Sequence, residues 1–172
     1  MVGRSGTGVS TLLNTVARAA KHDGFKSIGI SDGSAGLAEV ADQWLPLRNL
    51  TAEAMTSALE SFDDEDRVLV VVDRVSKLSA EASDVLKKWI LASSPGAGMV
   101  VAGDRPPAVS GIVTGLLKEL VSYKTGFLLC PDSASATPFA NRIASTLMAP
   151  RLVGRAVFFQ EGDPVTSVQV AH

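Results

Sequence analysis

Glycines and hydroxyl side chains at the start of the chain have the types and spacing of a phosphate-binding loop. Gly3, Gly8 and Ser10 fit the pattern G-x-x-x-x-G-K-[ST]. In that pattern backbone N–H groups surround the phosphates, the lysine contacts the β- and γ-phosphates, and the hydroxyl holds Mg²⁺. Val9 stands where the lysine belongs. The loop therefore predicts nucleotide binding and argues against efficient hydrolysis.

We expect a nucleotide, ATP with Mg²⁺, to contact the whole loop and to bind weakly or not at all. Ser10 is the predicted metal ligand, and only when nucleotide is bound. Arg4 has two interpretations: it replaces the missing lysine, or it is a solvated side chain at a tolerant loop position. The predicted nucleotide-binding residues are Gly3, Arg4, Ser5, Gly6, Thr7, Gly8, Val9, Ser10 and Thr11.

A second predicted site residue is Asp73, which ends the apolar run Val68–Val72. A carboxylate at this place holds the Mg²⁺ shell in phosphate-loop NTPases, so Asp73 is the second predicted metal ligand; a plain turn at the strand end is the alternative. Hydrolytic members place an acid next to it as a base for water. Here the neighbour is Arg74, which cannot accept a proton. We therefore assign no catalytic residue.

Asp104 and Arg105 follow the next predicted strand, where a polar sensor residue would meet the γ-phosphate. Arg105 could contact phosphate or a neighbouring subunit. A surface ion pair between the two residues is the alternative interpretation.

Length and composition favour one globular domain, residues 1–172, with 46% hydrophobic and 20% charged residues. The net charge of -2 makes nucleic acid an unlikely partner, because tight non-specific binding needs an excess of positive charge. A single cysteine fits a reducing compartment. No signal peptide or membrane span is found, which predicts a cytoplasmic domain without direct membrane insertion.

The hydrophobic pattern alternates helix and strand. Helices are expected over 10–22, 51–62, 79–93, 109–121 and 137–148, and another over 34–49 that gives way to a loop at Pro46. Strands are expected over 26–31, 68–72, 99–102 and 125–129, with a hairpin from 155–159 and 166–171. This order predicts an α/β fold: a mostly parallel sheet with helices on both faces and a C-terminal antiparallel hairpin. Only Met1 and Val2 precede the loop, so its strand is largely missing, which suggests a fragment of a larger multi-domain protein.

Two later segments resemble FtsK/SpoIIIE-type ATPases. The segment 104–118, Asp-Arg-Pro-Pro-Ala-Val-Ser-Gly-Ile-Val-Thr-Gly-Leu-Leu-Lys, resembles the Arg-Pro pair and the helix that follow the fourth strand of that family. The tail, residues 154–171, looks like its closing hairpin and is similar to the late ATPase modules of EccC/EssC, the membrane-anchored motor of type VII secretion. The resemblance implies a RecA-like core, ring or tandem assembly with other ATPase modules, and an active site completed by a neighbour's arginine.

Val9 and Arg74 depart from that family. We therefore predict a degenerate module, an inactive or very weak ATPase that regulates a translocation or secretion motor or docks its secreted peptide, within a membrane-anchored assembly. One alternative is an active ATPase completed by Arg4 or by a neighbour's arginine. Another is a fragment of a DNA-translocase motor, which the net charge disfavours.

Overall fold

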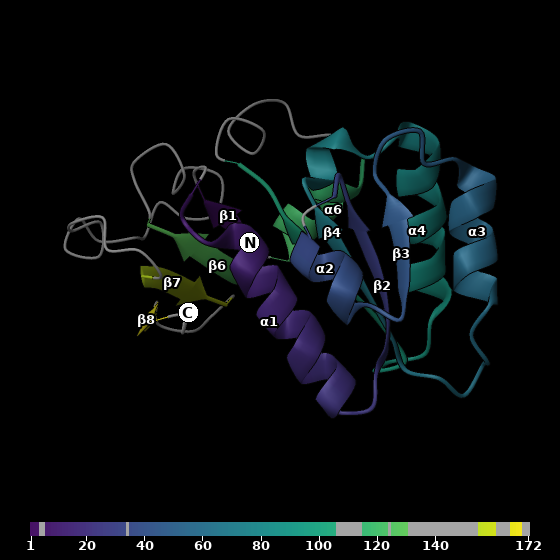
Figure 1. Cartoon of the computed structure of the whole chain (residues 1–172), viewed down its shortest axis with the longest axis horizontal. Coiled ribbons are helices and arrows are strands. Elements are labelled where there is room, and N and C mark those ends of the chain that lie inside the picture. The colour runs from purple at the N-terminus through teal and green to yellow at the C-terminus, as the bar shows by residue number, and fades with distance from the viewer. Residues whose placement is uncertain are drawn as a thin grey trace. The chain divides into compact units, whose positions relative to one another are not determined.

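The computed structural model describes residues 1–3, 6–33, 35–105, 115–123, 125–130, 155–160 and 166–169 (Figure 1). The chain divides into two compact units. The first contains residues 1–12 and 103–172, and the second contains residues 13–102. Helix α1 (Val9–His22) begins in the first unit and continues into the second. Within the described residues, no helix has the length and apolarity needed to cross a bilayer.

The second unit is built on a sheet with the strand order β3-β2-β4-β5. Strand β2 runs parallel to both of its neighbours, β3 and β4. Every residue of β4 is buried, which is typical of a central parallel strand covered on both faces. The strands are β2 (Lys26–Ser31), β3 (Gln43–Pro46), β4 (Val68–Asp73) and β5 (Gly98–Gly103).

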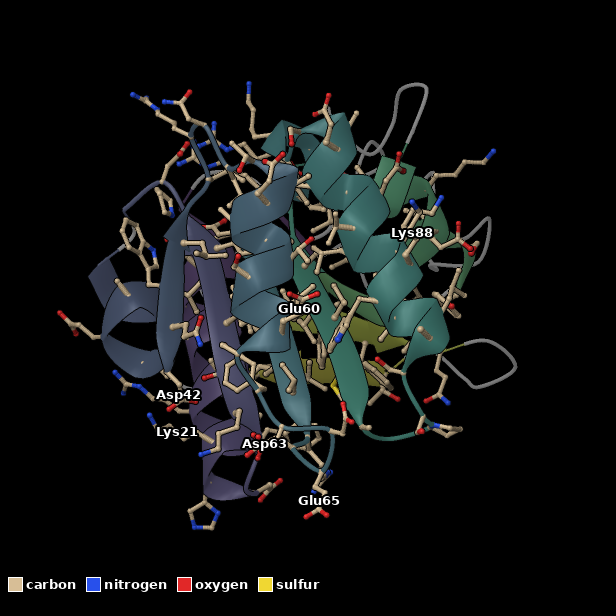
Figure 2. All side chains as sticks on the ribbon, turned by 90° about the vertical axis from the view of Figure 1, so that its right-hand side faces the viewer. Lys21, Asp42, Glu60, Asp63, Glu65 and Lys88 are labelled. Carbon is tan, nitrogen blue, oxygen red and sulfur yellow. The ribbon has the colours of Figure 1, made fainter. Side chains whose placement is uncertain are left out.

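Helices cover both faces of this sheet. Helices α3 (Ala52–Glu60) and α4 (Ala80–Ala92) lie side by side on the face toward the viewer in Figure 2. Helix α2 (Ala35–Val40) packs on the other face, where a Cβ added at Gly29 of β2 would lie only 2.8 Å from Leu37 Cγ. A short 3₁₀ helix, η1 (Val75–Lys77), follows β4.

The predicted starts of α3 and α4 are confirmed by their caps. The Thr51 hydroxyl accepts a hydrogen bond from the Ala54 amide, and the Ser79 hydroxyl accepts one from the Ala82 amide, both at 3.2 Å. Each bond satisfies an amide that has no partner within its helix. The polar residue before each apolar stripe was therefore a reliable signal.

The prediction for residues 34–49 was wrong in its second half. The helix there ends at Val40, and residues 43–46 form β3, which pairs with β2. Trp44 and Leu45 suit a pleated strand, and Pro46 is tolerated because it closes a strand at the edge of the sheet. The sequence pattern predicts a loop at Pro46, whereas Pro46 is the last residue of β3.

The first unit contains the sheet β1-β6-β7-β8. Strand β1 is parallel to β6, and β6 is antiparallel to β7. Strand β7 is antiparallel to β8, which confirms the predicted C-terminal hairpin. The elements are β1 (Val2–Gly3), α6 (Gly115–Ser122), β6 (Gly126–Leu129), β7 (Arg155–Phe159) and β8 (Thr166–Gln169). The helix expected over 137–148, and the part of the 109–121 helix before Gly115, lie outside the described residues.

Candidate functional site

The loop between β1 and α1 has the backbone of a tight, glycine-dependent turn. Gly6 and Gly8 have φ angles of 79° and 95°, a region that is costly for residues with a Cβ. The helix begins at once after Gly8, whose carbonyl accepts the first helical hydrogen bond, from the Leu12 amide at 2.8 Å. The geometry agrees with the predicted strand–loop–helix. Arg4 and Ser5 lie outside the described residues.

Gly3, the last residue of β1, is enclosed on the side where a side chain would project. A Cβ at Gly3 would collide with the Thr7 hydroxyl oxygen and would lie 2.9 Å from Leu129 Cβ and 3.0 Å from Val9 Cγ2. The Val9 side chain is therefore turned back toward the end of β1, beside Leu129 of β6. The position that carries the charge in a working loop contributes apolar packing here.

Backbone dipoles remain as a source of positive potential. The N–H groups of the first helical turn have no partners within the helix, so the N-terminus of α1 favours an anion. No acidic side chain occupies that turn. Ser10 is half-buried and Thr11 is exposed. These features support the loop as a phosphate contact and provide a hydroxyl where the motif places the Mg²⁺ ligand.

Asp104 lies beside the loop strand and is buried. Its amide donates to the Met1 carbonyl at 3.0 Å, and its carbonyl accepts from the Gly3 amide at 3.2 Å, so its backbone extends the pairing of β1. Its carboxylate accepts a hydrogen bond from the Arg105 amide at 2.7 Å, and Arg105 itself is exposed. The structure thus brings the predicted sensor pair to the strand that carries the loop.

Asp73, the other predicted metal ligand, ends β4 and is 8% exposed. It belongs to the second unit, whereas Ser10 belongs to the first. The joint role of Ser10 and Asp73 around Mg²⁺ stays a prediction.

The partner of Arg74 was not predicted from the sequence. The Arg74 Nη2 atom lies 3.7 Å from Asp32 Oδ2, and the Arg48 Nε atom lies 3.9 Å from Asp32 Oδ1. Within the described part of the chain, Asp32 Oδ1 is buried and accepts no hydrogen bond. The sequence held part of the signal, because Asp32 and Arg74 each closely follow a predicted strand; the structure adds that these two strands are parallel neighbours, whose ends share one edge of the sheet. Arg74, which replaces the expected base, is thus paired with a carboxylate.

The described residues fit a nucleotide in part. The glycines, the open N-terminus of α1 and the Ser10 hydroxyl suit phosphate and its magnesium ion. Among the described loop residues, 6–11, none carries a positive charge. Residues 6–11 could therefore contact phosphate only through backbone groups and hydroxyls, and the charge that develops during phosphoryl transfer would lack the usual lysine of the motif.

Comparison with solved structures shows that the fold of this chain is similar to that of several ATPase domains. The chain aligns with EssC (ATPases 2 and 3) from Geobacillus thermodenitrificans at a TM-score of 0.73 and 20% identity, over 98% of this chain and 36% of that one. It aligns with the cytoplasmic domain of EssC at a TM-score of 0.72 and 17% identity, over 98% of this chain and 38% of that one. It also aligns with Thermomonospora curvata EccC (ATPases 2 and 3) in complex with a signal sequence peptide. The TM-score is 0.69 and the identity 11%, over 99% of this chain and 36% of that one.

These matches confirm the predicted fold and its resemblance to EccC/EssC ATPase domains. No protein-family model and no curated protein sequence matches the chain. The chain spans little more than a third of the structures named above.

Proposed function

We propose that this chain is a degenerate FtsK/SpoIIIE-like nucleotide-binding module of a translocation or secretion motor. It binds ATP weakly, hydrolyses it very slowly or not at all, and acts by regulating neighbouring ATPase modules or by docking secreted substrate. The observation that carries the proposal is the packing of Val9, whose methyl group lies toward Gly3 where the motif requires a lysine. The fold shared with EssC and EccC supports the assignment to a secretion motor.

Arg74 supports the same conclusion. It stands where hydrolytic relatives carry a base, and its charge is paired with Asp32. Loss of one preorganised cation lowers phosphoryl-transfer rates by roughly a thousandfold, and loss of the base lowers them by roughly a further hundredfold. The backbone N–H groups of the loop are unaffected by both changes, so weak ATP binding is retained although hydrolysis is lost.

The proposed assembly follows from the fold relatives. The cytoplasmic setting, the neighbouring ATPase modules and the membrane-anchored motor are all proposed by analogy with EssC and EccC. Because one EccC structure contains a signal sequence peptide, we include docking of a secreted peptide in the proposed role.

Restoring the lysine gives the sharpest test. Labelled ATP is titrated against the wild type and the Val9→Lys and Ser10→Ala variants, with and without Mg²⁺, and hydrolysis is measured in parallel. We expect weak wild-type binding, about tenfold tighter binding for Val9→Lys because it adds a charge-assisted contact, and loss of the Mg²⁺ effect in Ser10→Ala. The matched control is Ala19→Lys, which adds the same charge at an exposed position of the same helix.

Two results would contradict the proposal. Hydrolysis by the wild type at ordinary motor rates that is lost in Ser10→Ala would show an active ATPase. If Arg4→Ala also abolished that hydrolysis, Arg4 would be the replacement for the lysine. Equal gains in affinity for Val9→Lys and Ala19→Lys would show that any added positive charge suffices and that the loop is not the binding site.

A further inference from the structure

A hollow of about 320 Å³ lies in the second unit at the amino ends of its parallel strands. It opens where α3 and α4 both end and where β4 begins. Figure 2 shows Asp63 and Glu65 below the end of α3. The residues that line it include Leu59, Phe62, Asp63, Asp64, Asp66 and Trp89.

The hollow has a strongly negative rim. Residues 63–66, Asp-Asp-Glu-Asp, form a turn that we call the acidic turn, and the Asp63 amide donates to the Asp66 carboxylate at 3.2 Å within it. The C-termini of α3 and α4 add partial negative charge, and neither helix has a basic residue in its last turn. Within the described part of the chain, no ion pair neutralises the acidic turn.

The nearest cation along the chain is already engaged elsewhere. The Arg67 guanidinium carbon lies 3.9 Å from the centroid of the Phe25 ring, and Arg67 Nη1 donates to the Asp23 carbonyl at 3.4 Å. Arg67 directly follows the acidic turn in sequence but is bound to the loop before β2. In the described part of the chain, Arg67 therefore forms no ion pair with the acidic turn.

The inner wall of the hollow is apolar and aromatic. Phe62 and Trp89 are half-buried, and Leu59 is buried. The Trp89 ring is held in place, because a Cβ at Gly98 would lie 3.1 Å from Trp89 Cη2. An aromatic wall beside carboxylates suits one chemical group in particular, a guanidinium or ammonium carried on an apolar stem.

Other occupants fit less well. Within the described residues, no group of three or more His, Cys, Asp and Glu side chains is placed to hold a metal ion, so the acidic turn is not arranged as a metal site. An acidic peptide or a nucleotide would be repelled by the rim. The volume lies at the lower limit of small-molecule pockets and suits one or two side chains.

We propose that this hollow binds a basic segment of a polypeptide partner, whose Arg or Lys side chain lies against Phe62 and Trp89 while its charge meets the acidic turn. The cationic group lies over the aromatic faces, and its apolar stem and neighbouring apolar residues cover Leu59. This contact goes beyond the proposed nucleotide role and does not depend on it.

The test uses the full chain and a short fluorescein-labelled peptide of alternating Arg and Leu. Fluorescence anisotropy should show binding that weakens as salt is raised. Asp63→Asn combined with Asp64→Asn should weaken binding by about tenfold. The matched control, Glu39→Gln combined with Asp84→Asn, removes two exposed charges that do not line the hollow, and it should change affinity by less than about twofold.

A second measurement locates the contact. The chain has two tryptophans, so Trp44→Phe leaves Trp89 as the only reporter, and its emission should change when an unlabelled Arg–Leu peptide binds. Circular dichroism of each variant checks that it is folded. Absence of binding, equal weakening by both charge pairs, an unchanged Trp89 emission, or equal binding of a Glu–Leu peptide would each overturn the proposal. None of these outcomes bears on ATP binding at the loop.

Discussion

The carboxylate of Asp42 and those of the acidic turn both lie at the amino edge of the same sheet, but they differ in the partners that they have. Asp42 precedes β3 and is fully engaged: it accepts hydrogen bonds from the Ser27 amide at 2.8 Å, the Ser27 hydroxyl at 2.9 Å and Lys21 Nζ at 2.8 Å. Figure 2 shows Lys21 and Asp42 next to each other. The acidic turn precedes β4 and, within the described residues, has no such cationic partner.

The comparison distinguishes a carboxylate that stabilises the fold from carboxylates that are exposed to a binding partner. Ser27 is fully buried, so its amide and hydroxyl need the Asp42 carboxylate as an acceptor. Asp63 and Asp64 are exposed, and among the described residues no buried group donates a hydrogen bond to either carboxylate. We infer that Asp42 stabilises the junction of β2 and β3, whereas the acidic turn contributes surface potential.

The largest expected effect follows removal of the engaged carboxylate. Asp42→Ala leaves the buried Ser27 amide without its acceptor, which should lower the free energy of unfolding by about 2 kcal/mol in urea denaturation. Lys21→Ala is the control, because it removes the ion pair and keeps both Ser27 bonds. Its cost should be below about 1 kcal/mol. Equal losses in the two variants would show that the ion pair, and not Ser27, makes Asp42 structural.

A smaller effect should appear as a dependence on pH. Burial acts to raise the pKa of Asp42, but the hydrogen bonds from Lys21 and Ser27, together with the charge of Lys21, hold that pKa below its ordinary value. A carboxyl group whose pKa is lower in the folded state stabilises the fold above its unfolded pKa, and this contribution is lost as pH falls through the folded pKa.

The stability difference between wild type and Asp42→Asn should therefore be constant near neutral pH and shrink below about pH 4. Urea denaturation between neutral pH and pH 3 measures it. Ser27→Ala removes one of the hydrogen bonds that lower the pKa of Asp42 and should flatten the same pH dependence. A difference that grows toward low pH would contradict the assignment.

The smallest expected effect is at the acidic turn. Asp63→Asn with Asp64→Asn should change the free energy of unfolding by no more than about 0.5 kcal/mol, toward higher stability, because like charges are removed. Urea denaturation at low and high salt measures the change, and the gain should be smaller at high salt. A decrease in the free energy of unfolding of more than about 1 kcal/mol would show that the acidic turn stabilises the fold as Asp42 does.

Much of the fold could be predicted because local and global signals agree. The apolar run before Asp73 predicted a central strand, and polar caps marked the starts of α3 and α4. Strand β3 was missed because it is short, ends in proline and follows a short helix without a clear break. Its strand character comes from pairing with β2, a long-range contact that no local pattern contains.

The candidate site was predictable only in part, for a similar reason. The loop motif is contiguous, so its glycines and the place of Val9 could be found in the sequence. The pairing of Arg74 with Asp32 required knowledge that β2 and β4 are neighbours. The hollow could not be anticipated, because Phe62 and Trp89 come from different helix ends and converge only after folding.

The position of the acidic turn has a consequence for the chain before it folds. Only Arg67 separates it from β4, whose sequence Val-Leu-Val-Val-Val is the kind of short, apolar, β-branched segment that drives aggregation. During synthesis and refolding that segment is exposed, and its neighbours in sequence are four like charges and Arg67. Flanking charges of this kind act as gatekeepers, because two copies of the segment that pair parallel and in register bring their carboxylates together. We therefore expect the acidic turn to oppose self-association of β4 before the strand, all of whose residues are buried in the folded chain, has found its place in the sheet.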